Sequence, residues 1–284
     1  MAGGAGAALT GLAADPVASG RGSSLIRVKT PTADEPGWDF KGVDPRLLFK
    51  GKDDERGRFF LSLALVYNDL KGIAFLQWLA KEREVQRTEG EVSAEAGNFN
   101  GTQLQLTRYL AGLLYELCKL IEEHHEIVQS MPVTALVART PMEARASWNR
   151  LVDVALKREG RRDELRTLLE RIRDNLTFHY YKPKDLSLGF ERHFFELEKT
   201  AHNESAYYSP GKTMEFTRFF YADAAAQAGV LRWAAIIHIE KATDEISALA
   251  GKVNVALRFI VEEFILERSK GKPSPSGGRR KRGR

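Results

Sequence analysis

The chain reads TQLQLTRYLAGLLYELCKLIEEHHEIVQS from Thr102 to Ser130, and this stretch decides the fold class. Its large aliphatic residues recur at intervals of three and four positions: Leu106, Leu110, Leu113, Leu114, Leu117, Leu120 and Ile121. That spacing places the apolar side chains on one side of an α-helix, which is the signal of an amphipathic helix. Because such a helix buries its apolar side against other helices, the stretch predicts an all-α protein.

Comparable patterns extend to both sides of this stretch. Helices are expected over residues 58–84, 102–130, 141–157, 161–181, 213–228 and 231–267, with a short amphipathic segment at 190–197. The first of these carries apolar side chains around most of its circumference, which predicts a deeply buried, central helix. The third starts at Thr140–Glu143, which has the form of a capping box. Residues 88–101 are polar and contain three glycines, so a loop is expected there.

We therefore expect an all-α fold, a bundle of about five to seven helices in a single domain over residues 38–268. No stretch of the sequence reads as a convincing strand. Residues 1–37 are rich in Ala and Gly, and residues 269–284 are basic and lack large apolar side chains. Such segments cannot bury enough apolar surface to order themselves, so both ends are expected to be disordered tails.

The positive charge of the chain is concentrated in its last residues. The formal net charge is +5, and residues 269–284 contain seven basic residues and no acidic one. Without them 36 basic and 38 acidic residues remain, so the domain itself is close to neutral. Such a tail attracts phosphate groups in a salt-sensitive manner, or it serves only to keep the chain in solution.

Several protein classes can be set aside at this stage. The single cysteine, Cys118, excludes an intramolecular disulfide and a multi-cysteine metal site, and it is most simply a small core residue. The longest uncharged apolar stretch, Phe59–Tyr67, is too short for a bilayer, and residues 1–20 do not resemble a secretory signal. We therefore expect a soluble cytoplasmic protein that has no membrane partner.

Two short motifs have simpler explanations than the chemistry they suggest. Ser209–Thr213 is similar to the end of a phosphate-binding loop, but Ala206 stands where that pattern needs glycine, and a helix start after a turn explains it better. Glu122 and His125 have the spacing used in di-iron bundles, but the chain has no second Glu-x-x-His. A solvated helix end is the preferred interpretation, and neither a metal nor a cofactor is expected.

Residues 171–181, RIRDNLTFHYY, concentrate cations, an acid, an amide, a histidine and two phenols at the end of a predicted helix. At about 100° per residue, Asn175 and His179 share a face, which Arg171 joins. Arg173 lies about 120° around the axis from His179, so these two do not converge on one straight helix. They could meet at a distorted helix end, or across a two-fold axis between two copies.

A histidine and an arginine together can cleave RNA without a metal ion. His179 would move protons to and from the reacting oxygens, and Arg173 would donate hydrogen bonds to the phosphate as charge develops. Asp174 or Asn175 could orient either side chain. The alternative is an ordinary helix end, in which Arg173 pairs with a carboxylate and His179 lies near the negative end of the helix dipole.

The segment from Arg173 to His179 resembles the mark of the HEPN superfamily, whose members are helical bundles and include many prokaryotic ribonucleases. That mark is an arginine, a polar residue and a histidine a few positions on; here five residues separate Arg173 from His179. The residues Phe178–Tyr180 are similar to a short sequence motif in bacterial members of this superfamily. The resemblance implies that Arg173 and His179 are catalytic, with Asp174 as the accompanying polar residue.

The resemblance also implies a mechanism and partners. Such ribonucleases are typically homodimers whose two motifs face each other across a shared cleft, need no metal ion and leave a 2′,3′-cyclic phosphate. Many act as toxins or in phage defence, some with an antitoxin as a regulatory partner, and some members only bind.

We therefore expect a metal-independent endoribonuclease that acts on RNA. The alternative is a non-catalytic helical protein that binds a partner or nucleic acid through the same helix end. The expected site residues are Arg173, His179, Asp174 and Asn175 for catalysis, and Arg171 and Tyr180 for contact with the substrate.

Overall fold

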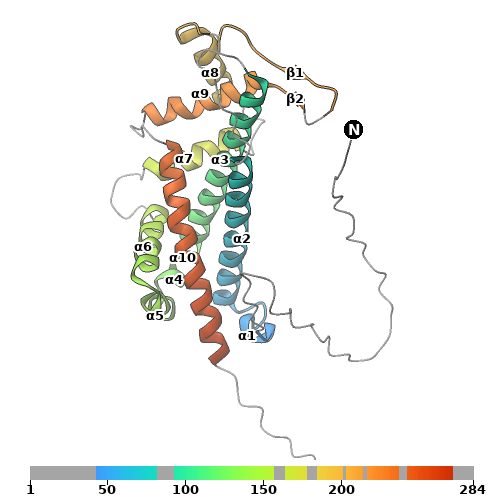
Figure 1. Ribbon diagram of the computed structural model, residues 1–284. Helices are drawn as coiled ribbons and strands as arrows, with labels where there is room; N and C mark the ends of the chain where they lie inside the picture. The colour runs from blue at the N-terminus through green and yellow to red at the C-terminus, as the bar shows by residue number, and fades with distance from the viewer. Residues whose placement is uncertain are drawn as a thin grey trace, which may run out of the picture. The chain divides into compact units, whose positions relative to one another are not determined.

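The chain folds into a helical bundle, as Figure 1 shows for a computed structural model. The structure describes residues 43–81, 93–156, 164–177, 184–200, 203–213, 216–236 and 242–270, all within one compact unit, Val43–Arg284. The predicted all-α class is confirmed for these residues. The predicted disordered N-terminus and residues 271–284 of the basic tail lie outside the described residues.

The described residues form ten α-helices and one small hairpin. The helices are α1 (Pro45–Leu48), α2 (Glu55–Lys81), α3 (Ala94–Glu123), α4 (His125–Gln129), α5 (Met131–Arg139), α6 (Met142–Leu156), α7 (Glu164–Ile172), α8 (Lys184–Glu191), α9 (Phe220–Ile236) and α10 (Ala242–Lys270). Two π-helical turns, η1 (Arg173–Thr177) and η2 (Arg192–Glu196), extend α7 and α8. The strands β1 (Ser209–Pro210) and β2 (Thr217–Arg218) pair antiparallel. Thus the expected final helix over 231–267 is two helices, α9 and α10, and the latter includes the first two residues of the predicted tail.

The apolar stripe of α3 forms the centre of the core. Its buried side contacts α2, α6, α7, α9 and α10, so the leucine spacing that predicted this helix also identified its role. Leu117, Cys118 and Ile121 have no exposed surface, which agrees with the interpretation of Cys118 as a core residue. Helices α2, α3 and α10 run side by side, and α6 lies against α10 (Figure 1).

The expectation of a deeply buried, central helix over residues 58–84 is wrong. Helix α2 buries Phe59, Phe60, Leu63 and Leu70 against α3 and α10, but large apolar residues on its other side remain exposed. By length and composition alone α2 could cross a membrane, and only 22% of its most apolar window is buried. The apolar residues on all sides of this helix therefore predicted packing partners on all sides, but within the bundle α2 has partners on one side.

Helix α3 begins eight residues earlier than the sequence predicted. Ser93 caps it, since its hydroxyl oxygen accepts a hydrogen bond from the Ala96 amide at 3.3 Å. Two of the three glycines that suggested a loop, Gly97 and Gly101, lie inside the helix and next to the start of α9, and Gly90 lies outside the described residues. A methyl group on Gly97 would lie 2.9 Å from the Phe220 ring, and one on Gly101 would lie 2.7 Å from the Arg218 guanidinium carbon. These glycines therefore permit a close tertiary approach.

The segment Ser209–Thr213 forms strand β1 and the first residues of the turn that follows it, not the start of a helix. Gly211 has a φ of +40°, and a side chain there would collide with the backbone of Phe216. Ser209 Oγ donates a hydrogen bond of 2.6 Å to the Phe216 carbonyl, which closes the turn. Helix α9 consequently starts at Phe220, seven residues after the predicted start.

The predicted capping box is not formed as expected, although α6 begins where the sequence placed it. The Thr140 hydroxyl donates to the Val137 carbonyl at 2.7 Å and so closes α5 instead of accepting from the amides of α6. Thr140 is buried between the two helices. Thr140 therefore marks the boundary by ending α5 and not by capping the start of α6.

Ion pairs tie the end of α10 to the beginning of α2. The Asp54 carboxylate accepts hydrogen bonds from the amides of Gly57 at 2.9 Å and Lys50 at 3.1 Å, and from the Arg268 guanidinium at 2.8 Å. Glu267 accepts from Arg56 at 2.6 Å and from Arg139 on α5 at 2.7 Å. The Asp54 and Arg268 side chains are 10% and 12% exposed, so solvent screens this pair only partly.

Acid should destabilise the protein through these carboxylates. Partial burial by itself raises the pKa of Asp54, but the amide and Arg268 hydrogen bonds outweigh it, and the net pKa lies below its ordinary value of 3.8. Because the folded pKa is the lower one, the stabilisation is complete above about pH 4 and is lost as the pH falls through the folded pKa. We expect chemical denaturation at pH 7, 4 and 3 to show a smaller decline for Asp54→Asn than for the wild type. Equal declines would contradict the assignment.

Candidate functional site

The helix that carries the Arg173 motif changes its geometry at Arg173. Leu165, Leu168, Leu169 and Ile172 bury the stripe of α7 against the core. After Ile172 the backbone continues as the π-helical turn η1, Arg173–Thr177, which is buried at its end by Leu176 and Thr177. Single π-helical turns are rare and occur frequently at functional sites. The distorted helix end that the sequence analysis considered is therefore present at the motif.

Side-chain hydrogen bonds anchor η1 on α3. The Thr177 hydroxyl lies 3.0 Å from the Ile172 carbonyl oxygen and 3.2 Å from that of Arg108. Arg108 also donates a hydrogen bond of 3.0 Å to the Leu176 carbonyl. Arg108 of α3 thus satisfies the Leu176 carbonyl, and Thr177 links the turn to the Arg108 carbonyl, which keeps this turn in a defined position.

Arg173 is fixed between two carboxylates. Its Nε donates to Glu116 Oε1 of α3 at 2.9 Å, and a terminal nitrogen donates to Asp174 Oδ1 at 2.8 Å. The hydrogen bond that Arg173 donates to Asp174, followed by the charge of Glu116, raises the pKa of Arg173 above its ordinary value, so the group stays cationic. The side chain is 28% exposed, which leaves the guanidinium accessible from solvent.

Of the remaining predicted site residues, Arg171 and Asn175 belong to the described part of the chain, and His179 and Tyr180 do not. The Asn175 side-chain nitrogen donates to the Arg171 carbonyl at 3.1 Å, so Asn175 braces the backbone of the turn, and both residues are half-buried. Among the described residues the structure therefore brings Asp174 to Arg173 and Asn175 to Arg171. His179 and Tyr180 lie outside the described residues.

A polar cluster that the sequence analysis missed surrounds Tyr115 of α3. The Arg166 guanidinium carbon lies 4.7 Å from the Tyr115 ring centroid, and Arg166 donates to Glu122 at 2.9 Å. The Tyr115 hydroxyl lies 3.4 Å from Glu170, and burial first, then the charge of Glu170, raises its pKa. The spacing of Arg166, Glu170 and Arg173, at four and three residues, was the available signal of a polar stripe facing α3.

The Glu122–Glu126 segment offers no metal site in the described part of the chain. Glu122 pairs with Arg166, and the His124 ring lies 5.7 Å from the ring of Phe59. Among the residues that the structure describes, no group of three or more His, Cys, Asp or Glu side chains could hold a metal ion. The end of α3, which was expected to be solvated, thus also forms an ion pair between Glu122 and Arg166.

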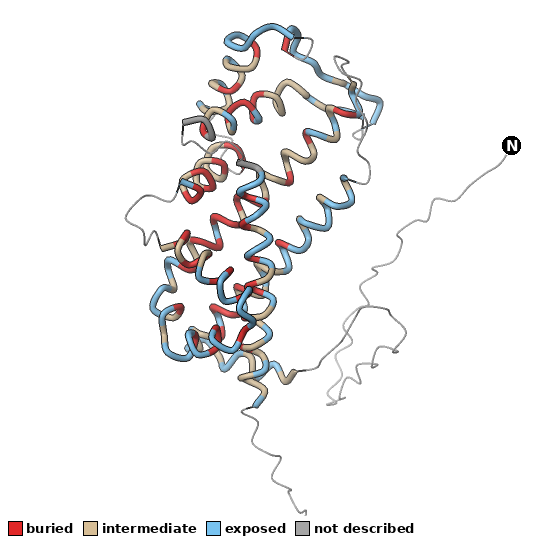
Figure 2. The backbone as a smooth tube through the Cα atoms, turned by 60° about the vertical axis from the view of Figure 1, so that its left-hand side comes forward, coloured by how far each residue is buried: buried red, intermediate tan, exposed pale blue. Residues whose placement is uncertain are grey.

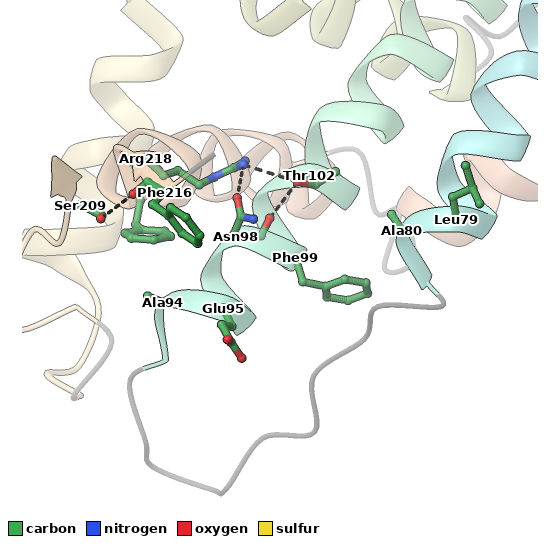
Figure 3. A pocket seen from close by; sticks show the side chains of 11 residues that line it. Leu79, Ala80, Ala94, Glu95, Asn98, Phe99, Thr102, Ser209, Phe216 and Arg218 are labelled. Carbon is green, nitrogen blue, oxygen red and sulfur yellow. Dashed lines mark hydrogen bonds between the residues drawn. The ribbon is translucent and has the colours of Figure 1, made fainter. Parts of the chain in front are cut away.

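Two adjoining cavities lie where the hairpin and α9 meet the first turns of α3. One has a volume of about 950 Å³ and extends to η2, and the other has about 710 Å³ and reaches the end of α2. Figure 3 shows the second, in which Arg218 reaches from the hairpin to Asn98 at 2.8 Å and Thr102 at 3.4 Å. Arg218 also donates to Asp223 at 2.8 Å. The one local signal of this region in the sequence was the pair Gly97 and Gly101, which was interpreted as part of a loop.

The larger cavity extends along α3 as far as Thr107. Leu104 and Thr107 line it, and Arg108, which binds the Leu176 carbonyl, follows directly in the helix. Aromatic side chains on the hairpin side are accessible, with Tyr208 62% and Phe219 53% exposed and their rings stacked at 6.4 Å. Accessible aromatic rings next to an open cavity suit a flat or extended ligand.

Comparison with known proteins adds no family. No protein-family model, no curated protein and no solved structure matches the chain. The class that the fold defines is an all-α helical bundle, and the function must be argued from the site itself.

Proposed function

We propose that the chain is a metal-independent endoribonuclease, similar to HEPN ribonucleases, that acts on RNA at the end of α7. The observation that supports this best is the placement of Arg173. Its guanidinium is held by Asp174 at 2.8 Å and Glu116 at 2.9 Å at the start of a π turn, and it remains partly exposed. A positioned cation that needs no reorganisation is what stabilisation of a charged transition state requires.

The proposed reaction assigns one role to each residue. His179, acting as a general base, removes the proton of the ribose 2′-hydroxyl, whose oxygen then attacks phosphorus. A general acid protonates the departing 5′-oxygen, and a 2′,3′-cyclic phosphate remains on the other fragment. Arg173 donates hydrogen bonds to the phosphate oxygens as negative charge develops on them. Asp174 orients Arg173, Asn175 braces the turn, and Arg171 and Tyr180 contact the substrate.

The second candidate is a non-catalytic helical protein that binds a partner or nucleic acid through the same helix end. One observation favours it: two contacts of the Arg173 guanidinium are carboxylates, so a phosphate must compete with Glu116 and Asp174 for this cation. An ion-pair cluster around Tyr115 would also serve as a purely structural brace between α3 and α7.

Incubation of the purified protein with total RNA distinguishes the two candidates. The ribonuclease proposal expects cleavage that EDTA does not change and fragments that end in a 2′,3′-cyclic phosphate. His179→Ala should remove this activity without changing the helix content. Absence of cleavage by the wild type, with RNA or a protein partner still bound, would favour the binding protein. The ribonuclease proposal also expects that expression of the protein in the cytoplasm is toxic and that an antitoxin relieves this toxicity.

A further inference from the structure

The exposed side of α2 carries a row of large apolar residues. The exposed fractions are 63% for Leu61, 61% for Leu65, 55% for Phe75, 50% for Leu76, 55% for Trp78 and 40% for Leu79. The Phe75 and Trp78 rings stack at 5.8 Å, so the row is continuous at that end. The C-terminal half of α2 is accordingly exposed over most of its length (Figure 2).

This surface is as large as the largest apolar patch of a typical monomer. At roughly 200 Å² for a whole large apolar side chain, the six residues leave on the order of 600 Å² uncovered. The largest apolar patch on a typical monomer is about 300–600 Å² and is often functional, and a standard interface buries about 800 Å² on each partner. The exposed apolar side chains of α2 therefore approach the area of an interface.

Six exposed positions of α2, four of them apolar, also have the spacing of a helix that packs against another helix. They follow each other at intervals of four, three, four, three and four: Leu61, Leu65, Asn68, Gly72, Phe75 and Leu79. Leu76 and Trp78 lie to the two sides of this row. This is the heptad spacing of a helix–helix seam, about 27 Å long at 1.5 Å per residue. It lies opposite the buried side of α2, which contains Leu63 and Leu70. A lipid surface would require apolar residues but not this period.

We infer that α2 is the interface through which two copies of this chain associate, antiparallel along the seam Leu61–Leu79. The spacing of the seam reads the same from both ends, and its outer positions are all large and apolar. Leu61 faces the partner's Leu79, Leu65 faces the partner's Phe75, and Asn68 faces the partner's Gly72. A methyl group on Gly72 would meet no atom within 4 Å, so this position is open to a partner helix. Such a self-complementary surface is what a two-fold dimer requires.

The polar residues of the seam favour a protein partner over hydrocarbon. Asn68, Asp69 and Lys71 are exposed in the middle of α2. An amide inside a helix pair hydrogen-bonds across the seam and fixes the register, whereas in a bilayer it lacks partners. Asp69 and Lys71 lie on the two flanks of the seam, where each stays hydrated. The association therefore depends on apolar burial and not on ion pairs.

This interface is separate from the proposed ribonuclease site. Helix α2 packs mainly on α3 and α10, whereas the Arg173 turn packs on α3 and α8. The HEPN resemblance places the dimer contact at the motif, so the α2 seam is a different surface. The inference consequently stands or falls without the proposed function.

Sedimentation equilibrium of the wild type should show a reversible dimer. Leu65→Asp should raise the dimer dissociation constant at least tenfold, because a large apolar residue near the centre of an interface typically contributes a factor of that order. Leu231→Asp on α9 is the matched control, since Leu231 is 52% exposed and lies outside the seam. It should leave the dimer intact. Circular dichroism should show the same helix content in all three proteins.

Cysteine cross-linking tests the direction of the two helices. In an antiparallel pair two Leu65 positions are separated by about ten residues, or roughly 15 Å along the axis, which exceeds the reach of a disulfide. Leu65→Cys alone should therefore not cross-link, while a mixture of Leu65→Cys and Phe75→Cys should form a covalent dimer. Self-linking of Leu65→Cys would overturn the antiparallel arrangement.

Other outcomes would assign the surface to another occupant. A wild type that stays monomeric at all concentrations, or a Leu65→Asp variant that dimerises as the wild type does, would overturn the inference. A monomer that floats with vesicles of phosphatidylcholine and phosphatidylserine, and loses this binding in Leu65→Asp, would show a lipid surface instead. RNA cleavage measured on the same preparations tests the proposed function separately, because the seam contains none of the proposed site residues.

Discussion

Arg173→Ala should reduce RNA cleavage by at least about 100-fold, the loss typical for removing one transition-state hydrogen-bond donor. The reason is geometric: two carboxylates fix the guanidinium, and no other residue of η1 carries a cation. His179→Ala should lower the rate by about 100- to 10,000-fold, as expected for a general acid or base. Initial rates on a short labelled RNA, with and without EDTA, would measure both effects.

A matched arginine tests whether the loss is specific. Arg46 also pairs with a neighbouring aspartate, Asp44, at 2.8 Å, but it lies on α1 and is 88% exposed. Arg46→Ala should leave the rate within about twofold of the wild type, since surface ion pairs contribute little. Equal losses in Arg46→Ala and Arg173→Ala would indicate a general effect of charge on RNA binding and not a site.

The structural role of Arg173 must be separated from a catalytic one. Removing it leaves Glu116 and Asp174 without this cation, so a modest loss of about 0.5–1 kcal/mol in the free energy of unfolding is expected. Arg173→Lys keeps the charge but not the planar pair of donors, and it should recover stability more than activity. Recovery of both to the same degree, or a much larger drop in melting temperature, would identify Arg173 as a structural brace.

The sequence was sufficient to predict the all-α class because the deciding information is local. The leucine spacing in α3 fixes which side of that helix is apolar, and burial of that side follows from the hydrophobic effect. The same holds for the stripe of α7. Periodicity reports which side of a helix is apolar, but it does not report how many neighbours the helix has. Helix α2 shows this limit, because its all-round apolar pattern was interpreted as central burial.

Glycine and hydroxyl residues were misinterpreted because their roles here are tertiary. Gly97 and Gly101 are inside α3, where the ring of Phe220 and the side chain of Arg218 need the space of a missing side chain. These partners lie more than 110 residues away in the chain, so propensity rules indicated a loop. Thr140 closes α5 instead of capping α6, which depends on how two consecutive helices meet.

The candidate site could be predicted only in part for the same reason. The adjacency of Arg173 and Asp174 is local, and their contact follows from neighbouring positions. The contact with Glu116 joins residues 57 positions apart and depends on the packing of α7 on α3. The change from α- to π-helical geometry at Arg173 was also not readable, because it depends on the hydrogen bonds that Arg108 and Thr177 make.

Gly189→Ala should destabilise the protein by about 2–3 kcal/mol, although alanine is ordinarily the better helix former. Gly189 lies where α8 crosses α9, and it is buried there. A methyl group would collide with the Ala225 carbonyl oxygen and lie 2.9 Å from the Gly229 nitrogen. Both are backbone atoms of a helix, which cannot rotate away as a side chain would. The two helices must therefore separate, and apolar contacts such as those of Ala225 and Ala226 are lost.

Two other glycines provide controls for this prediction. Gly229 lies at the same crossing, but the nearest atom to a methyl group there, the Asp185 carbonyl oxygen, is 3.5 Å away, an ordinary contact. Gly251→Ala on α10 meets no atom within 4 Å and should stabilise the protein by about 0.5–1 kcal/mol through helix propensity. In thermal unfolding, the midpoint of Gly189→Ala should thus lie roughly 4–12 °C below that of the wild type, and the midpoint of Gly229→Ala should lie near it. If Gly189→Ala melted at or above the wild-type temperature, α8 and α9 would not be in close backbone contact.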